Sequence, residues 1–358
     1  MRVALVVSVF PSREHPYIWD WACELVRNGV DLHILTEQVN VLQYTHFQNS
    51  EMKGRVHLLN QLKPGNNGAI HTGIPFAPEA WVRTMLVLQK QPVKLRSKLL
   101  KFYEYLPVLN QKFDLIHFNA PQIAVRRFEM KDIFQARALV SFRGQDFSFY
   151  PTRYDGLLKQ ADHLHFISTH LLALARSRGY EGTHHSIIPP VVDTNFYRPC
   201  PEDKNHAGES TILFTAARLE WVKGFEFALQ AVAILKQRGL NVEYYIAGEG
   251  EFKEAMLYTI DQLGLQDCVH LLGWQNPDEI RGWMWKSDLY ILASVSEAFN
   301  NSVLQAQACG LPVVCSDEGG LPENIADGET GLLFHRRDAW DMAEKIQTLL
   351  RDNARRSK

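Results

Sequence analysis

One stretch of the chain, residues 289–315, constrains the fold more than any other. Its two ends are short apolar runs, which predict two buried strands. Between them, Asn301 or Ser302 can cap a short helix that Gly310 ends. A strand, a loop, a helix and a second strand in this order form the repeating unit of a doubly wound α/β domain.

The expected helix start is also a candidate binding site. The first backbone N–H groups of such a helix point toward the carboxyl end of the preceding strand and favour an anion. Glu297 lies in the loop beside them, where a carboxylate is useful only if the ligand carries hydroxyl groups as well as phosphate. A nucleotide sugar carries both, whereas an isolated loop glutamate is ordinarily a solvated surface charge. The residues at this helix start that are expected to bind the nucleotide sugar, the donor of a sugar group, are Asn300, Asn301, Ser302, Val303 and Leu304.

The spacing around Glu297 resembles a known signature. Glu297 is followed by seven residues and then by the run Gln305–Gly310, which is similar to the Glu-x7-Glu motif of retaining family 4 glycosyltransferases. The resemblance implies that Glu297 holds sugar hydroxyls and the charge that develops on the ring. Gln305 stands where the family has its second glutamate, at the ribose hydroxyls. A neutral amide makes the weaker hydrogen bond, so we predict weaker nucleotide binding than with Glu.

A second motif precedes this one. Residues 217–224 resemble the family's Gly-Arg-Leu-x3-Lys-Gly, with alanine in place of the first glycine. Arg218 and Lys223 would hold a diphosphate and stabilise the charge on it as it leaves. The resemblance further implies that Gly248 and the backbone around Trp274 line the nucleotide pocket.

The first half of the chain resembles the family more loosely. Residues 2–35 predict a strand, a helix and a strand, but the first loop lacks the family's glycine pair and is similar to a variant of some exopolysaccharide transferases. His15 in this loop is expected to contact the sugar or the acceptor. Arg143 replaces the histidine of a His-Gly-x-Asp motif; it cannot act as a base but can bind phosphate or a hydroxyl. Pairing with Asp146 is the alternative.

Residues 80–103 mix apolar and basic side chains, and Pro92 divides them into two expected helices. Ordinary amphipathic helices with solvated lysines are one interpretation. The other is an interfacial surface that rests on anionic lipid and meets a lipid-linked acceptor.

Length and composition agree with two ordinary domains. The chain has 358 residues, 46% of them hydrophobic and 22% charged, and its first half is basic whereas its second half is acidic. The five cysteines show no metal-ligand spacing, and no apolar run is long enough for a bilayer. We expect a cytoplasmic protein, with contact at the inner face of the membrane as the alternative. We expect a first domain of residues 1–197, joined by a C-terminal helix at about 339–358, then a linker at 198–210 and a second domain at 211–338.

The resemblance implies the GT-B fold, two Rossmann-like domains that face each other across a cleft. The implied reaction moves a sugar from a nucleoside diphosphate sugar to a hydroxyl acceptor, a glycan, lipid-linked saccharide or small molecule, with retention of configuration. No metal or other cofactor is expected, and no nucleic-acid motif is present. The alternatives are a two-domain sugar-binding sensor, a nucleotide-sugar epimerase of the same fold and a degenerate transferase.

Overall fold

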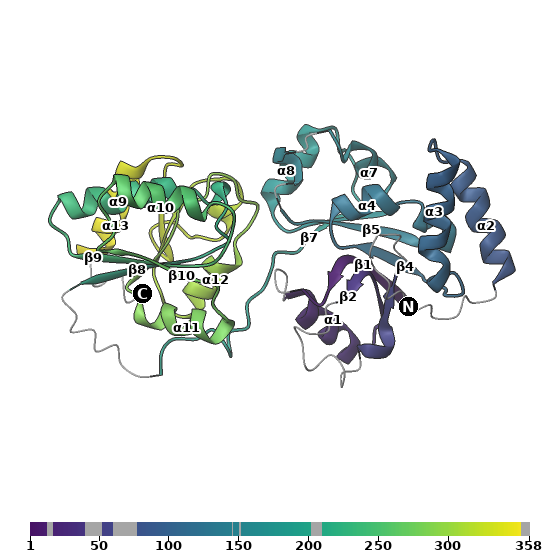
Figure 1. Ribbon diagram of the computed structural model, residues 1–358, viewed down its shortest axis with the longest axis horizontal. Helices are drawn as coiled ribbons and strands as arrows, with labels where there is room; N and C mark the ends of the chain where they lie inside the picture. The colour runs from purple at the N-terminus through teal and green to yellow at the C-terminus, as the bar shows by residue number, and fades with distance from the viewer. Residues whose placement is uncertain are drawn as a thin grey trace. The chain divides into compact units, whose positions relative to one another are not determined.

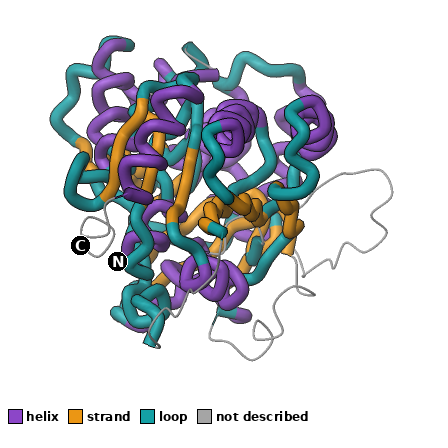
Figure 2. The backbone as a smooth tube through the Cα atoms, turned by 90° about the vertical axis from the view of Figure 1, so that its left-hand side faces the viewer, coloured by secondary structure: helices purple, strands orange, loops and turns teal. Residues whose placement is uncertain are grey.

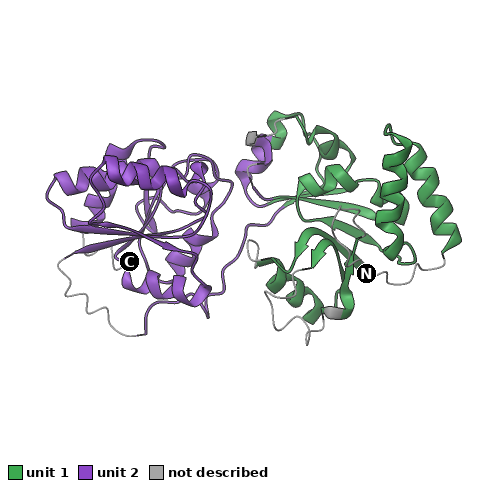
Figure 3. Ribbon diagram, in the orientation of Figure 1, with its two compact units in different colours: residues 1–142, 150–166, 175–186 green, residues 143–149, 167–174, 187–358 purple. Residues whose placement is uncertain are grey.

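The protein consists of two compact units, each built on its own parallel sheet (Figure 3). The computed structural model describes residues 1–12, 17–39, 52–59, 77–144, 146–149, 152–201 and 210–351. Unit 1 comprises residues 1–142, 150–166 and 175–186, and unit 2 comprises residues 143–149, 167–174 and 187–358. The predicted linker stays a prediction, because most of it lies outside the described residues.

Unit 1 is a seven-stranded sheet with the order β3-β2-β1-β4-β5-β6-β7. Its strands are β1 (Arg2–Phe10), β2 (Asp31–Val39), β3 (Val56–Leu58), β4 (Leu115–Phe118), β5 (Arg137–Phe142), β6 (His163–Phe166) and β7 (His185–Ile187). Its helices are α1 (Tyr17–Arg27), α2 (Pro78–Gln89), α3 (Leu95–Tyr105), α4 (Pro121–Arg127), α5 (Met130–Phe134) and α7 (Asp155–Gln160), while α6 (Asp146–Phe149) and α8 (Thr169–Ser177) fall wholly or partly in the segments assigned to unit 2. The β1–α1–β2 start and the break between α2 and α3 at Pro92 confirm the predictions for these segments.

Unit 2 is a six-stranded sheet with the order β10-β9-β8-β11-β12-β13. Its strands are β8 (Thr211–Ala216), β9 (Val242–Ala247), β10 (Val269–Gly273), β11 (Leu289–Leu292), β12 (Val313–Ser316) and β13 (Gly331–Phe334). Its helices are α9 (Phe225–Gln237), α10 (Lys253–Gln262), α11 (Pro277–Lys286), α12 (Asn301–Ala308) and α13 (Ala339–Arg351). Numbered within the unit, the strand order is 3-2-1-4-5-6, the order of a Rossmann sheet.

Both faces of the unit 2 sheet are covered, as its near-continuous apolar strands require. One apolar core joins the sheet to α9, α10 and α13, and a second core joins it to α11 and α12 (Figure 1). Figure 2, turned by 90°, shows strands lying between helices. The carboxyl ends of the strands and the helix starts that follow them therefore form the free edge where ligands bind in such folds.

The last helix corrects one prediction. We expected the helix from about 339 to 358 to cross to the first domain, but α13 packs on α9, β12 and β13 of unit 2. Its buried side chains Met342, Ala343, Ile346 and Leu349 belong to the core of unit 2. The apolar stripe of this amphipathic helix is thus satisfied locally as far as Arg351; residues 352–358 lie outside the described part of the chain.

None of the helices in the described part of the chain is both long enough and apolar enough to cross a membrane.

Candidate active site

The predicted site residues of unit 2 gather where the strand order of the sheet reverses. β8 and β11 are neighbours in the sheet although they are far apart in sequence. Arg218 follows β8, and Glu297 and α12 follow β11. In open α/β sheets this switch point leaves a crevice at the carboxyl ends of the strands, because the helices on its two sides lie on opposite faces.

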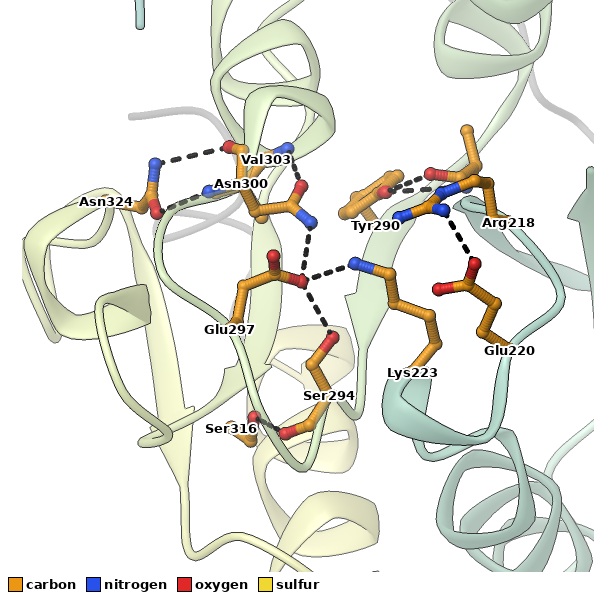
Figure 4. Close-up of polar contacts among 11 residues, drawn as sticks. Arg218, Glu220, Lys223, Tyr290, Ser294, Glu297, Asn300, Val303, Ser316 and Asn324 are labelled. Carbon is orange, nitrogen blue, oxygen red and sulfur yellow. Dashed lines mark hydrogen bonds and ion pairs between the residues drawn. The ribbon is translucent and has the colours of Figure 1, made fainter. Parts of the chain in front are cut away.

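Glu297 is held by three hydrogen-bond donors (Figure 4). Its Oε2 atom accepts from Lys223 Nζ at 2.5 Å, from Ser294 Oγ at 3.2 Å and from Asn300 Nδ2 at 3.2 Å. The side chains of Glu297 and Lys223 are each only 11% exposed. All three donors use the same oxygen, and Oε1 accepts from none of the described residues. The arrangement fixes the carboxylate while leaving one oxygen for a ligand hydroxyl.

The start of α12 is tied to this carboxylate. The side chain of Asn300 caps the helix, since its Oδ1 accepts from Val303 N at 3.0 Å while its Nδ2 donates to Glu297. The cap is therefore Asn300 and not Asn301 or Ser302 as we expected, and the N–H group of Val303 is already used. Gly310 does lie just beyond the end of the helix, with φ of 72°.

Asn324, which the sequence did not single out, holds the cap in place. Its Oδ1 accepts from Asn300 N at 3.2 Å, and its Nδ2 donates to Asn300 O at 3.2 Å. Both residues are buried. A pair of hydrogen bonds to the backbone of the capping residue makes the loop between β11 and α12 rigid, and therefore the Glu297 carboxylate as well.

Tyr290 is the second residue that sequence reasoning missed, because it lies within an apolar strand pattern. Its ring is fully buried, and its hydroxyl donates to Ala216 O at 3.1 Å. The side chain of Ser302 also bonds to this hydroxyl, and burial raises the pKa of Tyr290 far above its usual value. Tyr290 thus links the end of β8, just before Arg218, to the start of α12. A tyrosine in an otherwise aliphatic strand was the available signal.

Two glycines let the backbone approach closely at this edge. Gly224, the residue after Lys223, has φ of 62°, and a Cβ there would lie 2.0 Å from Ala293 O. A Cβ at Gly248 would lie 1.9 Å from Ala217 O, next to Arg218. Only glycine fits either position. Gly224 therefore brings Lys223 against the loop of Glu297, and Gly248 lies beside the turn that carries Arg218.

Arg218 is placed differently from Lys223. Its side chain is largely exposed, and its Nη1 donates to Glu220 Oε1 at 2.6 Å. Figure 4 shows Lys223 between Glu297 on one side and the Arg218–Glu220 pair on the other. The two cations therefore belong to one edge of the sheet, one fixed by a shielded ion pair and the other on a solvated side chain.

The other residues predicted from the resemblance are on α12 or follow β10, the edge strand of the sheet. Asn301, Leu304 and Gln305 are on α12 and are half-buried. Trp274 directly follows β10, and its side chain is half exposed. The contacts of these residues do not test the roles that the resemblance implies for them, so those roles stay predictions.

Two further predicted residues, Arg143 and His15, come from the first half of the chain. Arg143 follows β5, and its backbone N–H donates to Asp146 Oδ2 at 3.1 Å, so Asp146 caps the turn at the main chain of Arg143. His15 lies outside the described residues. Asn119, which the sequence analysis did not single out, follows β4; it is buried, and its Oδ1 has no hydrogen-bond partner among the described residues.

The fold and the location of the site define a class of protein, and comparison with known proteins agrees. The chain superposes on Anabaena Alr3699/HepE in complex with UDP and glucose with a TM-score of 0.75 and 18% identity, covering 100% of this chain and 92% of that one. Two Rossmann-like sheets with this likeness are the GT-B fold, as the sequence predicted.

Residues 200–358, in the second half of the chain, match the model of the family "Glycosyl transferases group 1". The chain is 32% identical over 183 residues to D-inositol 3-phosphate glycosyltransferase of Arthrobacter sp. (strain FB24), which covers 48% of this chain and 43% of that protein. It is 25% identical over 373 residues to the putative colanic acid biosynthesis glycosyltransferase WcaL of Escherichia coli (strain K12), covering 97% and 90%. The first curated relatives that it matches are covered over only 43 to 61% of their length.

Proposed function

We propose that this protein is a glycosyltransferase that moves a sugar from a nucleoside diphosphate sugar to a hydroxyl acceptor with retention of configuration. One observation carries the proposal: Glu297 is fixed beside Lys223 and the capped start of α12, at the switch point of a sheet in a group 1 domain. The site combines a cation, a helix start and a carboxylate with one free oxygen. A ligand with both phosphate and hydroxyl groups satisfies all three.

The diphosphate is proposed to lie at Lys223 and Arg218. An ammonium group has three N–H donors, so Lys223 can keep its bond to Glu297 and still donate to a phosphate oxygen. Arg218 would exchange its exposed contact with Glu220 for a second phosphate oxygen, to which a guanidinium donates in a fork. The two cations stabilise the negative charge that grows on the diphosphate as the glycosidic bond breaks.

Glu297 is proposed to orient the sugar. Its Oε1 would accept from ring hydroxyls, while the bonds to Oε2 prevent the carboxylate from turning away. The same negative charge would stabilise a ring that becomes positive at the transition state. Attack by the acceptor on the face that the diphosphate leaves, with a diphosphate oxygen taking the proton, then gives retention of configuration.

The donor is proposed to be a nucleotide sugar, as the UDP and glucose bound by the Anabaena neighbour suggest. Gln305 is proposed at the ribose, Gly248 and Trp274 beside the base, and Arg143 at an anionic or hydroxyl group. His15 is proposed on the acceptor side. We propose transfer without a metal ion, because Arg218, Lys223 and the start of α12 would supply the positive charge that a diphosphate needs. We also propose a cytoplasmic location, where nucleotide sugars are made.

A panel of UDP-, GDP- and ADP-sugars tests the donor. The expected result is a rise in melting temperature with one of them, release of the nucleoside diphosphate when an acceptor is added, and full activity in EDTA. Proton NMR of the product gives its anomeric configuration, and inversion would contradict the mechanism. Conversion of the nucleotide sugar without an acceptor would instead identify an epimerase, and binding without turnover a degenerate transferase or a sensor.

A further inference from the structure

The hairpin of α2 and α3 in unit 1 exposes apolar side chains on a surface that the proposed reaction does not use. The two helices pack together, and Figure 1 shows them side by side. α2 turns Ala80, Thr84 and Leu88 inward. On its other side Val82 is 61% exposed and Leu86, one turn later, is 55% exposed.

The turn and α3 continue this apolar surface. Leu95 is 70% exposed and Leu99, one turn later, is 50% exposed; Val93 and Leu100 are exposed as well. Isolated apolar residues on a surface need no explanation, but six on one helical hairpin form a patch, which in a monomer marks an interaction site.

The charge of this hairpin is mainly positive; its acidic residues are Glu79 at the start of α2 and Glu104 near the end of α3. Residues 80–103 contain six lysines and arginines and no aspartate or glutamate. Lys90, Lys94 and Arg96 surround the turn, are exposed, and form no ion pair with any acidic residue of the described chain. Their charge therefore faces solvent among the exposed leucines.

Of the three remaining basic residues, Lys98 joins the two helices by donating to Gln89 O at 2.7 Å, and the other two hold the hairpin to the rest of unit 1. Lys101 forms an ion pair with the buried Glu129, which also accepts from Tyr105 OH at 2.8 Å. Arg83 Nε donates to Ile133 O at 2.6 Å. These contacts lie on the inward side of the hairpin and hold it in place. The outward surface therefore has its shape before binding, and binding does not carry the entropic cost of ordering it.

We propose that the outward surface of the α2–α3 hairpin docks on an anionic lipid bilayer. Leucine and valine would enter the boundary between headgroups and acyl chains, and the three cations at the turn would lie at the level of the phosphates. A second copy of the chain fits less well, because a two-fold interface would bring the same cations together. Docking would bring an acceptor that is carried on a lipid close to unit 1. This proposal does not depend on which sugar donor the protein uses.

Helix α10 of unit 2 offers a matched comparison. It also exposes two adjacent large apolar residues, Leu257 and Tyr258, but its exposed charges are Lys253, Glu254 and Asp261, so the net charge of the helix is negative. Exposed apolar side chains on a helix of net negative charge should give no attraction to anionic lipid.

Vesicle flotation of the full chain tests the proposal, with phosphatidylcholine alone and with about 30% phosphatidylglycerol added. The variants are Lys90→Gln/Lys94→Gln/Arg96→Gln and Leu95→Gln/Leu99→Gln, and the control is Leu257→Gln/Tyr258→Gln. We expect the wild type and the control to float only with the anionic vesicles. The vesicle partition coefficient of the triple variant should fall by about a hundredfold, because each lost cation lowers it by about tenfold or less. Binding of the wild type should weaken with added salt. The leucine variant should also lose binding.

Equal flotation of the triple variant, or no flotation of the wild type with anionic vesicles, would overturn the proposal. So would a dimer in light scattering that the hairpin variants abolish, since the surface would then join two copies of the chain. The thermal shift with the nucleotide sugar serves as an independent readout. It should be the same in all variants, so that failure of the lipid proposal and failure of the proposed transferase activity remain distinguishable.

Discussion

Removal of the Lys223 ammonium group tests whether its ion pair with Glu297 serves catalysis as well as structure. Lys223→Met keeps most of the aliphatic stem but leaves the Glu297 carboxylate with only Ser294 and Asn300 as donors. Loss of one partner from a fully buried pair destabilises a protein by roughly 3–5 kcal/mol. Because both side chains are 11% exposed and two donors remain, we expect about 2 kcal/mol. In a unit of this size that lowers the melting temperature by about 4–8 °C.

The effect on transfer should be separate from this loss of stability. Lys223 is proposed to hold the leaving diphosphate, and loss of such a contact reduces the rate by about a hundredfold, or roughly 3 kcal/mol. In the double variant Lys223→Met/Glu297→Gln no unpaired carboxylate remains, and an amide can both accept and donate. We therefore expect the double variant to recover most of the melting temperature and none of the activity.

The assay measures melting temperature without ligand and kcat/KM for release of the nucleoside diphosphate, for the wild type, both single variants and the double variant. If Lys223→Met keeps activity within about threefold, the ion pair is structural and the proposed diphosphate site is wrong. Recovery of activity together with stability in the double variant would refute the reasoning as well. It would show that the rate had fallen only because the loop of Glu297 was disturbed.

Three further predictions follow from individual residues. Gln305→Glu should tighten UDP binding by roughly tenfold in calorimetry, since a charged acceptor makes the stronger bond to ribose; unchanged or weaker binding would count against the assignment. Gly224→Ala should lower the melting temperature strongly and abolish transfer, because its Cβ would meet a backbone oxygen at 2.0 Å, whereas Gly239→Ala, also at positive φ but with nothing within 4 Å, should cost only about 1 kcal/mol and leave activity intact. Burial, with a contribution from His33, lowers the pKa of His57 to about 4, so the unfolded chain binds this proton more readily. Stability is then present above about pH 6.5 and is lost as the pH falls toward 4, by on the order of 2 kcal/mol in denaturant titrations, and His57→Gln should flatten this slope.

The order of elements could be predicted because the local signals agree. Short apolar runs flank amphipathic segments, and glycines mark where helices end, so the strands predicted within residues 2–35 and at the two ends of residues 289–315 lie where the sequence placed them. The exact helix cap could not be predicted, since Asn300, Asn301 and Ser302 are all good caps. Asn324 decides among them by binding the backbone of Asn300 from a distant loop.

The path of the last helix is a similar case. Its amphipathic pattern predicts a buried face but does not say which surface covers that face, and α13 uses the core of its own unit.

The two doubly wound sheets could be predicted from the sequence, because periodicity and glycine positions are local properties of the chain, and the resemblance of two motifs to a known family singled out Glu297, Arg218 and Lys223 as candidate site residues. Which of these groups are in contact depends on the tertiary structure. Lys223 and Glu297 are 74 residues apart and are in contact because β8 and β11 are neighbours in the sheet. Tyr290 has no signal of its own in the apolar strand pattern, yet it joins the end of β8 to the start of α12. Contacts of this kind depend on strand order, which is set by the packing of the whole unit and cannot be read from any single segment.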